Sequence, residues 1–141
     1  MSCTLLHGSH RGAEDAEGPS TRRSSDILGA AIEVHRRLGA GLLESAYEQC
    51  LCHELRFRGI PIERQVPLPL TYREEKLDCG YRLDIVAYNS VLIEVKAVEK
   101  VLPIYRAQVL TYLKLTGIRL GLLINFNVEV LRSGIYRIIN E

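Results

Sequence analysis

The spacing of apolar positions changes along the chain, and each change marks a predicted element. After Ser24 the apolar residues recur at helical spacing, and the glycines within 39–41 divide this region into two helices. From position 62 the pattern becomes that of strands, interrupted by a mostly apolar helix after Pro103. The predicted helices cover 24–39, 42–59 and 104–117, and the predicted strands cover 62–72, 77–88, 91–98 and 119–126, followed by a terminal hairpin at 128–140.

The first part of the chain lacks this periodicity. Residues 1–22 are rich in glycine, serine, histidine and acidic residues, which predicts a disordered tail. Residues 23–141 are predicted to form a single α/β domain, because a chain of 141 residues leaves little room for a second core. Pro67 and Pro69 indicate a sheet edge or a bulge in the first strand, since proline cannot donate a ladder hydrogen bond.

Composition and charge exclude several classes of protein. The chain is 47% hydrophobic, yet no apolar run approaches the ~20 residues that span a bilayer, so we expect no membrane segment. The first residues do not combine a basic segment with an apolar stretch, which argues against a secretory signal and for a cytoplasmic protein. With a formal net charge of +1, contact with nucleic acid would require a local patch rather than overall charge.

The four cysteines, Cys3, Cys50, Cys52 and Cys79, form no C-x-x-C pair. We interpret them as reduced thiols, and a structural zinc site is not expected. Cys50 and Cys52 are two positions apart in a predicted helix and therefore point to different sides of it. Cys50 is the residue expected to fill the core.

Two carboxylates occur inside the apolar strands. Leu83, Ile85 and Ala87 are predicted to share one face of their strand, which leaves Asp84 on the other face. Glu94 occupies a similar position in the next strand, and the short turn between the strands makes them antiparallel neighbours. Asp84 and Glu94 are therefore expected to lie on one face, about 5 Å apart or diagonal to one another.

Two buried like charges require compensation, and a divalent cation supplies it best. Mg²⁺ takes one or two carboxylates and keeps several waters, so Asp84 and Glu94 are candidate ligands, with the carbonyl of Val95 as a third. Lys96 shares the face of Glu94 and could orient water or offset charge on a phosphoryl transition state. The alternative is a surface salt-bridge ladder, in which Asp84 pairs with Arg82 or Lys96.

The helix at 42–59 begins with a G-x-x-E-x-x-Y spacing formed by Gly41, Glu44 and Tyr47. Together with the segments GYRLDIVA, LIEVKAV, AQVLTYLKLTG and GLLINF, this stretch resembles the GxxExxY family of the PD-(D/E)XK nuclease superfamily. The resemblance extends from about residue 26 to 140. It implies a restriction-endonuclease-like core of helix, three strands, helix and strand, with a mixed central sheet flanked by helices, and a divalent-metal nuclease site.

The resemblance also implies residue roles. The matching positions are Glu44 for the helix carboxylate, Asp84 for the motif's aspartate, Glu94 and Lys96 for the (D/E)XK pair, and Gln108 for the polar residue on the helix beside the site. Leu83 stands where the superfamily has proline. A structural role is an open alternative at three positions: Glu44 could serve only the helix N-terminus, Tyr47 could serve only packing, and Gln108 could bond only to the backbone.

These observations predict a nuclease that uses Mg²⁺ or Mn²⁺ to hydrolyse phosphodiester bonds in nucleic acid, with DNA favoured over RNA. In this hypothesis Asp84 and Glu94 bind the metal, Lys96, Glu44 and Gln108 are catalytic, and Tyr47 and Gly41 support the site. A homodimer is a further expectation by analogy. One alternative is a catalytically silent module of the same fold that acts through a partner or dimer, and another is a metal-dependent phosphatase of small substrates.

Overall fold

The computed structural model describes residues 19–141. Helix α1 (Pro19–Leu38) begins five residues before the predicted helix, so the tail predicted for 1–22 extends too far, and its remaining part lies outside the described residues. Helix α2 (Glu44–Phe57) follows the glycine-containing loop. None of the helices in the described part of the chain has the length and apolar character needed to cross a membrane.

Five strands form the central sheet. The order is β1 (Ile62–Pro67), β4 (Arg82–Ala87), β5 (Val91–Lys96), β6 (Leu120–Asn125) and β7 (Ile135–Ile139). Only β5 and β6 are parallel, because helix α3 (Pro103–Thr116) provides the crossover between them. The mixed α/β fold of the restriction-endonuclease type is therefore confirmed.

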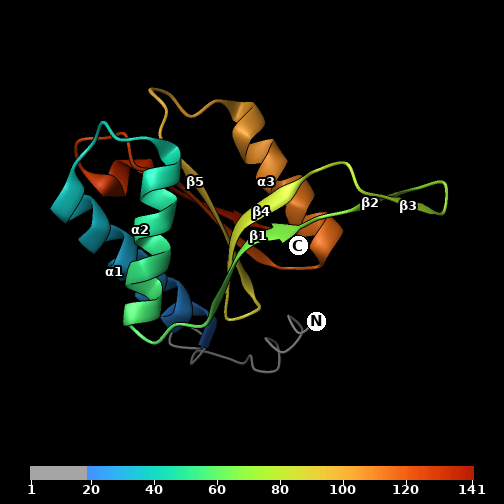
Figure 1. Cartoon of the computed structure of the whole chain (residues 1–141), viewed down its shortest axis with the longest axis horizontal. Coiled ribbons are helices and arrows are strands. Elements are labelled where there is room, and N and C mark those ends of the chain that lie inside the picture. Colours follow the sequence, from blue (N-terminus) through green and yellow to red (C-terminus); the bar gives the residue numbers. More distant parts are fainter. Residues whose placement is uncertain (1–18) are drawn as a thin grey trace.

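The helices cover both faces of this sheet (Figure 1). Helices α1 and α2 pack on one face, where Tyr47, Leu51 and Ile93 belong to the larger core cluster. Helix α3 packs on the other face, where Val109 and Leu113 belong to the smaller cluster. Strand β6 is buried along its whole length, as its continuous apolar sequence predicts.

The single strand predicted for 62–72 is wrong. Strand β1 ends at Pro67, and the chain then forms a separate hairpin of β2 (Leu70–Tyr72) and β3 (Glu75–Leu77) that projects from the body (Figure 1). Pro67, opposite Arg82, is the last residue of the ladder; the N–H of Leu68 donates to the carbonyl of Tyr81, and Pro69, which has no N–H to donate, follows. Strand β1 is an edge strand, as its prolines predict.

The terminal hairpin predicted around Ser133 and Gly134 is also wrong. Residues Leu131–Gly134 form the 3₁₀ helix η3, and β7 pairs antiparallel with β6 instead of with the preceding segment. Gly134 is required here for close approach, since a Cβ at this position would lie 2.1 Å from the carbonyl oxygen of Asn125.

The assignment of Cys50 to the core is wrong, because Cys50 is exposed and Cys52 is buried. The two thiols do point to different sides of α2. The buried residues of this helix are Tyr47, Leu51, Cys52 and Leu55, together with the carboxylate-bearing Glu48. Leu43 directly precedes the helix and is 76% exposed.

Candidate active site

Strands β4 and β5 separate at Asp84 and Glu94. Their ladder extends from Ala87 opposite Val91 to Ile85 opposite Ile93 and then stops. On the other side of β4, the pairing with β1 omits Asp84 and Gln65, and Gln65 has a left-handed φ of 54°. The regular sheet is thus interrupted on both sides of Asp84.

The interruption also changes the direction of the side chains. Leu83 packs with Val86 and Leu92 on the α3 side of the sheet, whereas Ile85 packs on the α1 and α2 side. The predicted sharing of one face by Leu83 and Ile85 is therefore wrong, because strict alternation requires a regular strand.

Where the ladder hydrogen bonds are missing, each carboxylate accepts a backbone hydrogen bond that a carbonyl of the neighbouring strand would accept in a regular ladder. The backbone N–H of Asp84 donates to Oε2 of Glu94 over 3.0 Å, and the backbone N–H of Val95 donates to Oδ2 of Asp84 over 2.9 Å. Buried N–H groups require an acceptor, and these two find it in the carboxylate of the neighbouring strand. Asp84 and Glu94 are consequently held side by side at the end of the ladder.

Both carboxyl groups resist ionisation. Burial raises the pKa of Glu94 to about 9, and repulsion from Asp84 adds to this effect. Burial also raises the pKa of Asp84 to about 6, although the hydrogen bond from Val95 favours its charged form. Two adjacent buried carboxyls therefore hold less negative charge than two exposed ones would, and a cation would relieve their repulsion.

Helix α2 brings two further carboxylates toward Asp84. Glu44 is its first residue and is exposed, and its charge raises the pKa of Asp84. Glu48 lies one turn later, is 5% exposed, and has a stronger effect on the same pKa. Its Oε2 accepts from Nε of Arg64 over 2.8 Å and from Nε2 of Gln65 over 2.6 Å. Glu48 therefore ties α2 to the irregular part of β1.

Sequence reasoning missed Glu48. It lies four residues after Glu44, one turn further along the same side of the helix. A carboxylate beside the buried stripe of a helix is a signal that could have identified it, since buried acidic groups need partners.

The Gly41 and Tyr47 positions organise the loop before α2. Gly41 has a φ of +102°, a conformation that residues with a Cβ rarely adopt. The hydroxyl of Tyr47 donates to the carbonyl of Gly39 over 2.5 Å and accepts from the N–H of Leu42 over 3.1 Å. The ring is fully buried and stacks on Phe126. Both residues thus shape the loop that delivers Glu44.

Tyr47→Phe is expected to lower the free energy of unfolding by about 1–3 kcal/mol, because it leaves two loop backbone groups without their partner. Denaturant unfolding of the full chain measures this loss. Tyr72→Phe is the matched control, since Tyr72 is 66% exposed and should change stability by less than about 0.5 kcal/mol. Equal stability of the two variants would contradict the role assigned to the Tyr47 hydroxyl.

Lys96 lies at the end of β5, two residues after Glu94, with its Nζ 4.5 Å from the ring centre of Tyr105 on α3. Gln108 is half-buried between Tyr105 and Tyr112 at helical spacing. Burial raises the pKa of the neighbouring Tyr112, and the negative charge of Glu94 raises it further. The structure shows no hydrogen bond from Gln108 to Asp84, Glu94 or Lys96 among the described residues.

Within residues 19–141 no group of three or more His, Cys, Asp or Glu side chains has the arrangement of a metal site. Asp84 and Glu94 nevertheless offer two adjacent oxygen donors, and Mg²⁺ needs only one or two carboxylates because it retains waters. The donor set therefore fits a hard divalent cation.

A mixed sheet between helical layers, with two acidic side chains where antiparallel strands separate, defines an α/β protein of the restriction-endonuclease type. The family model described as the PD-(D/E)XK nuclease superfamily matches residues 21–138. The chain belongs to this superfamily, whose members typically use divalent metals and act on nucleic acid. No curated protein and no solved structure matches the chain.

Proposed function

We propose that this protein is a divalent-metal-dependent nuclease of the GxxExxY type that hydrolyses phosphodiester bonds, with DNA as the favoured substrate. The observation that carries the proposal is the pair of buried carboxylates, Asp84 and Glu94, held at the end of the β4–β5 ladder with raised pKa values. Perturbed carboxyl pKa values accompany catalytic and metal-binding sites more often than ordinary surfaces.

Asp84 and Glu94 would hold Mg²⁺ or Mn²⁺, with the carbonyl of Val95 as a further oxygen donor. When bound, such a cation lowers the pKa of a coordinated water and polarises a phosphoryl oxygen. The chemistry of the site thus matches the needs of phosphodiester hydrolysis.

Three other side chains complete the proposed site. Lys96 supplies a positive charge that stabilises the negative charge developing on the phosphoryl group. Glu44 is an exposed carboxylate near Asp84 and can accept a proton from the attacking water. Gln108 would donate an amide hydrogen bond to substrate from α3, on the side of the sheet occupied by Tyr105 and Tyr112.

The test combines metal binding with cleavage. Mg²⁺ and Mn²⁺ are titrated by calorimetry into the full chain, and cleavage of DNA and RNA is followed with each metal. Asp84→Asn is expected to abolish both binding and cleavage, while Asp26→Asn, an exposed position on α1, should retain them. Metal binding without cleavage of either polymer would overturn the nuclease proposal and favour a catalytically silent binding module.

A further inference from the structure

The two edge strands of the central sheet differ in how well they are protected from pairing with a further strand. Strand β1 carries Pro67 and the left-handed Gln65, and both features discourage a further strand from pairing. Strand β7 has the sequence IYRII, with no proline, no left-handed residue and one charge, Arg137. Among the described residues no strand pairs with its outer edge. Alternate N–H and C=O groups of an edge strand point outward, so β7 presents an open ladder.

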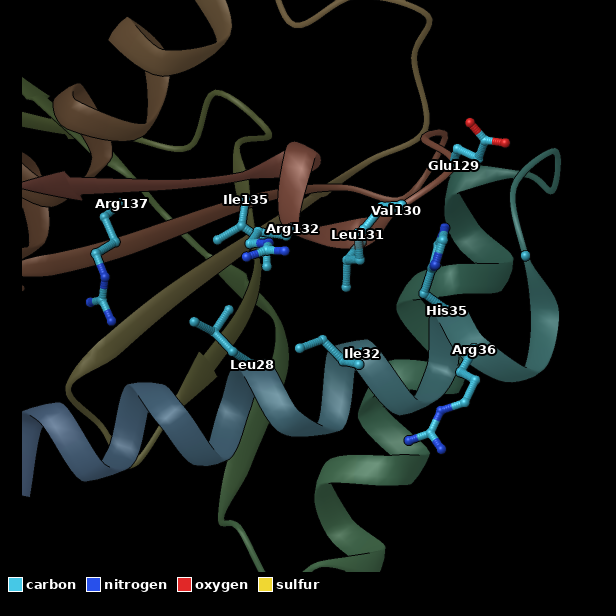
Figure 2. Close-up of a pocket in the computed structure, with 11 residues that line it drawn as sticks. Leu28, Ile32, His35, Arg36, Glu129, Val130, Leu131, Arg132, Ile135 and Arg137 are labelled. Atoms are coloured by element: carbon cyan, nitrogen blue, oxygen red, sulfur yellow. The ribbon is translucent and has the colours of Figure 1, made fainter.

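A groove of about 1110 Å³ runs beside this edge, between β7, η3 and α1. Figure 2 shows Leu28 and Ile32 of α1 pointing toward Ile135 of β7 across it. Ile32 is 44% exposed, and Leu28 and Ile135 are partly buried. The groove is therefore lined with apolar surface that remains accessible to solvent.

The rim of the groove is positively charged. Arg36, Arg132 and Arg137 line it, against the single carboxylate Glu129 at its outer end (Figure 2). Arg36 is paired with Glu33 on its own helix, whereas Arg132 and Arg137 form no ion pair with a described residue. Arg137 donates to Oγ of Ser24 over 2.9 Å, which is a neutral partner. Two arginines beside the open strand thus have no counter-charge within residues 19–141.

We propose that the β7 edge and this groove bind an extended segment of a partner protein that carries both acidic and apolar side chains on one face. Its backbone would pair with β7, and one set of alternate side chains would enter the groove. The apolar residues would contact Ile32 and Ile135, and the acidic ones would meet Arg132 and Arg137. None of the residues that line the groove belongs to the proposed active site, and this proposal does not depend on the nuclease proposal.

Two other occupants fit less well. A second copy of β7 would bring another Arg137 toward an arginine-rich rim, and like charges across a strand pair are destabilising. A nucleic-acid backbone would meet the arginines but would leave the apolar lining without a partner, and sheet-edge hydrogen bonds favour a polypeptide.

Fluorescence anisotropy with the full chain tests the proposal. The probe is a labelled ten-residue peptide with blocked ends, in 0.1 M salt, in which every second residue is in turn glutamate or valine and the residues between them are threonine, so that glutamate and valine share one face of the strand. We expect saturable binding that Arg132→Glu weakens at least tenfold. Lys114→Glu makes the same kind of charge change at an exposed site on α3 and should alter affinity less than twofold. Ile32→Thr should weaken binding with the charges unchanged.

A peptide with proline at alternate positions, which cannot complete the ladder, should not bind. Absence of binding by the original peptide, or equal loss in Arg132→Glu and Lys114→Glu, would overturn the proposal. Displacement of the peptide by an oligonucleotide would also overturn the proposal if the affinity of the oligonucleotide itself falls with Arg132→Glu. The proposal would likewise be overturned if the chain dimerises with increasing concentration and the dimer no longer binds the peptide. Tighter peptide binding after Glu14, Asp15 and Glu17 are changed to lysine would identify the chain's own acidic segment as the occupant and overturn the partner assignment.

Discussion

Lys96→Ala is expected to lower the rate of metal-dependent cleavage by at least about 100-fold, the usual loss when a group that stabilises transition-state charge is removed. The reason is its position at the end of β5, on the strand that carries Glu94 and beside the helix that bears Gln108. Single-turnover cleavage with saturating Mg²⁺ measures the chemical step. Metal affinity by calorimetry should change little, because an ammonium group is not a metal ligand.

Lys100→Ala is the matched control for this prediction. Lys100 is exposed beyond the end of β5, so its removal changes the net charge by the same amount without touching the site. A second variant, Lys96→Arg, keeps the contact of a cation with Tyr105 but changes the shape of the charged group. Cleavage by Lys96→Ala at the rate of Lys100→Ala would contradict a catalytic role for this lysine.

Stability in the absence of divalent metal is expected to fall as the pH rises from about 5 to about 9. In the folded protein burial raises the pKa of Glu94 to about 9, whereas an unfolded chain has a glutamate pKa near ~4.3. Between these values the folded state holds a proton that the unfolded state has lost. Raising the pH therefore favours unfolding, and one full proton corresponds to about 1.4 kcal/mol per pH unit. The pKa of about 6 for Asp84 acts in the same direction at lower pH.

Urea unfolding in EDTA at several pH values measures this slope. Glu94→Gln should show a shallower dependence than the wild type, because glutamine cannot ionise. Glu63→Gln is the control, since Glu63 is exposed on β1 and should leave the slope unchanged. Adding Mg²⁺ at pH 8 should stabilise the wild type more than Glu94→Gln. Parallel pH profiles of the free energy of unfolding for the wild type and Glu94→Gln would contradict the raised pKa of Glu94.

The local part of the candidate site could be predicted from the sequence. The turn between β4 and β5 occupies residues 88–90, where Tyr88 and Asn89 are left-handed and the N–H of Ser90 donates to the carbonyl of Ala87. This short turn makes the strands antiparallel neighbours, so Asp84 and Glu94 meet. Their pairing depends on positions only ten residues apart, and strand periodicity is sufficient to predict it.

Contacts between distant segments could not be predicted in this way. Glu48 reaches Arg64 and Gln65 across 16 and 17 residues, at a place where β1 is irregular. The predicted terminal hairpin failed for the same reason, because β7 pairs with β6 rather than with its nearest neighbour in sequence. Periodicity indicates which residues are buried, but the partner strand is selected by packing of the whole sheet.

The sequence alone determined the helix-and-strand order from α1 to β6 apart from the β2–β3 hairpin, the buried character of β6, and the adjacency of the two carboxylates, because each depends on local spacing and turn chemistry. The tertiary structure decided the rest. It interrupted the ladder at Asp84 and brought Glu44 and Glu48 toward it from α2. It also left the β7 edge without a pairing strand from residues 19–141, beside an arginine-rimmed groove. These features arise where separate elements meet, and the free energy of packing, not local propensity, sets how they meet.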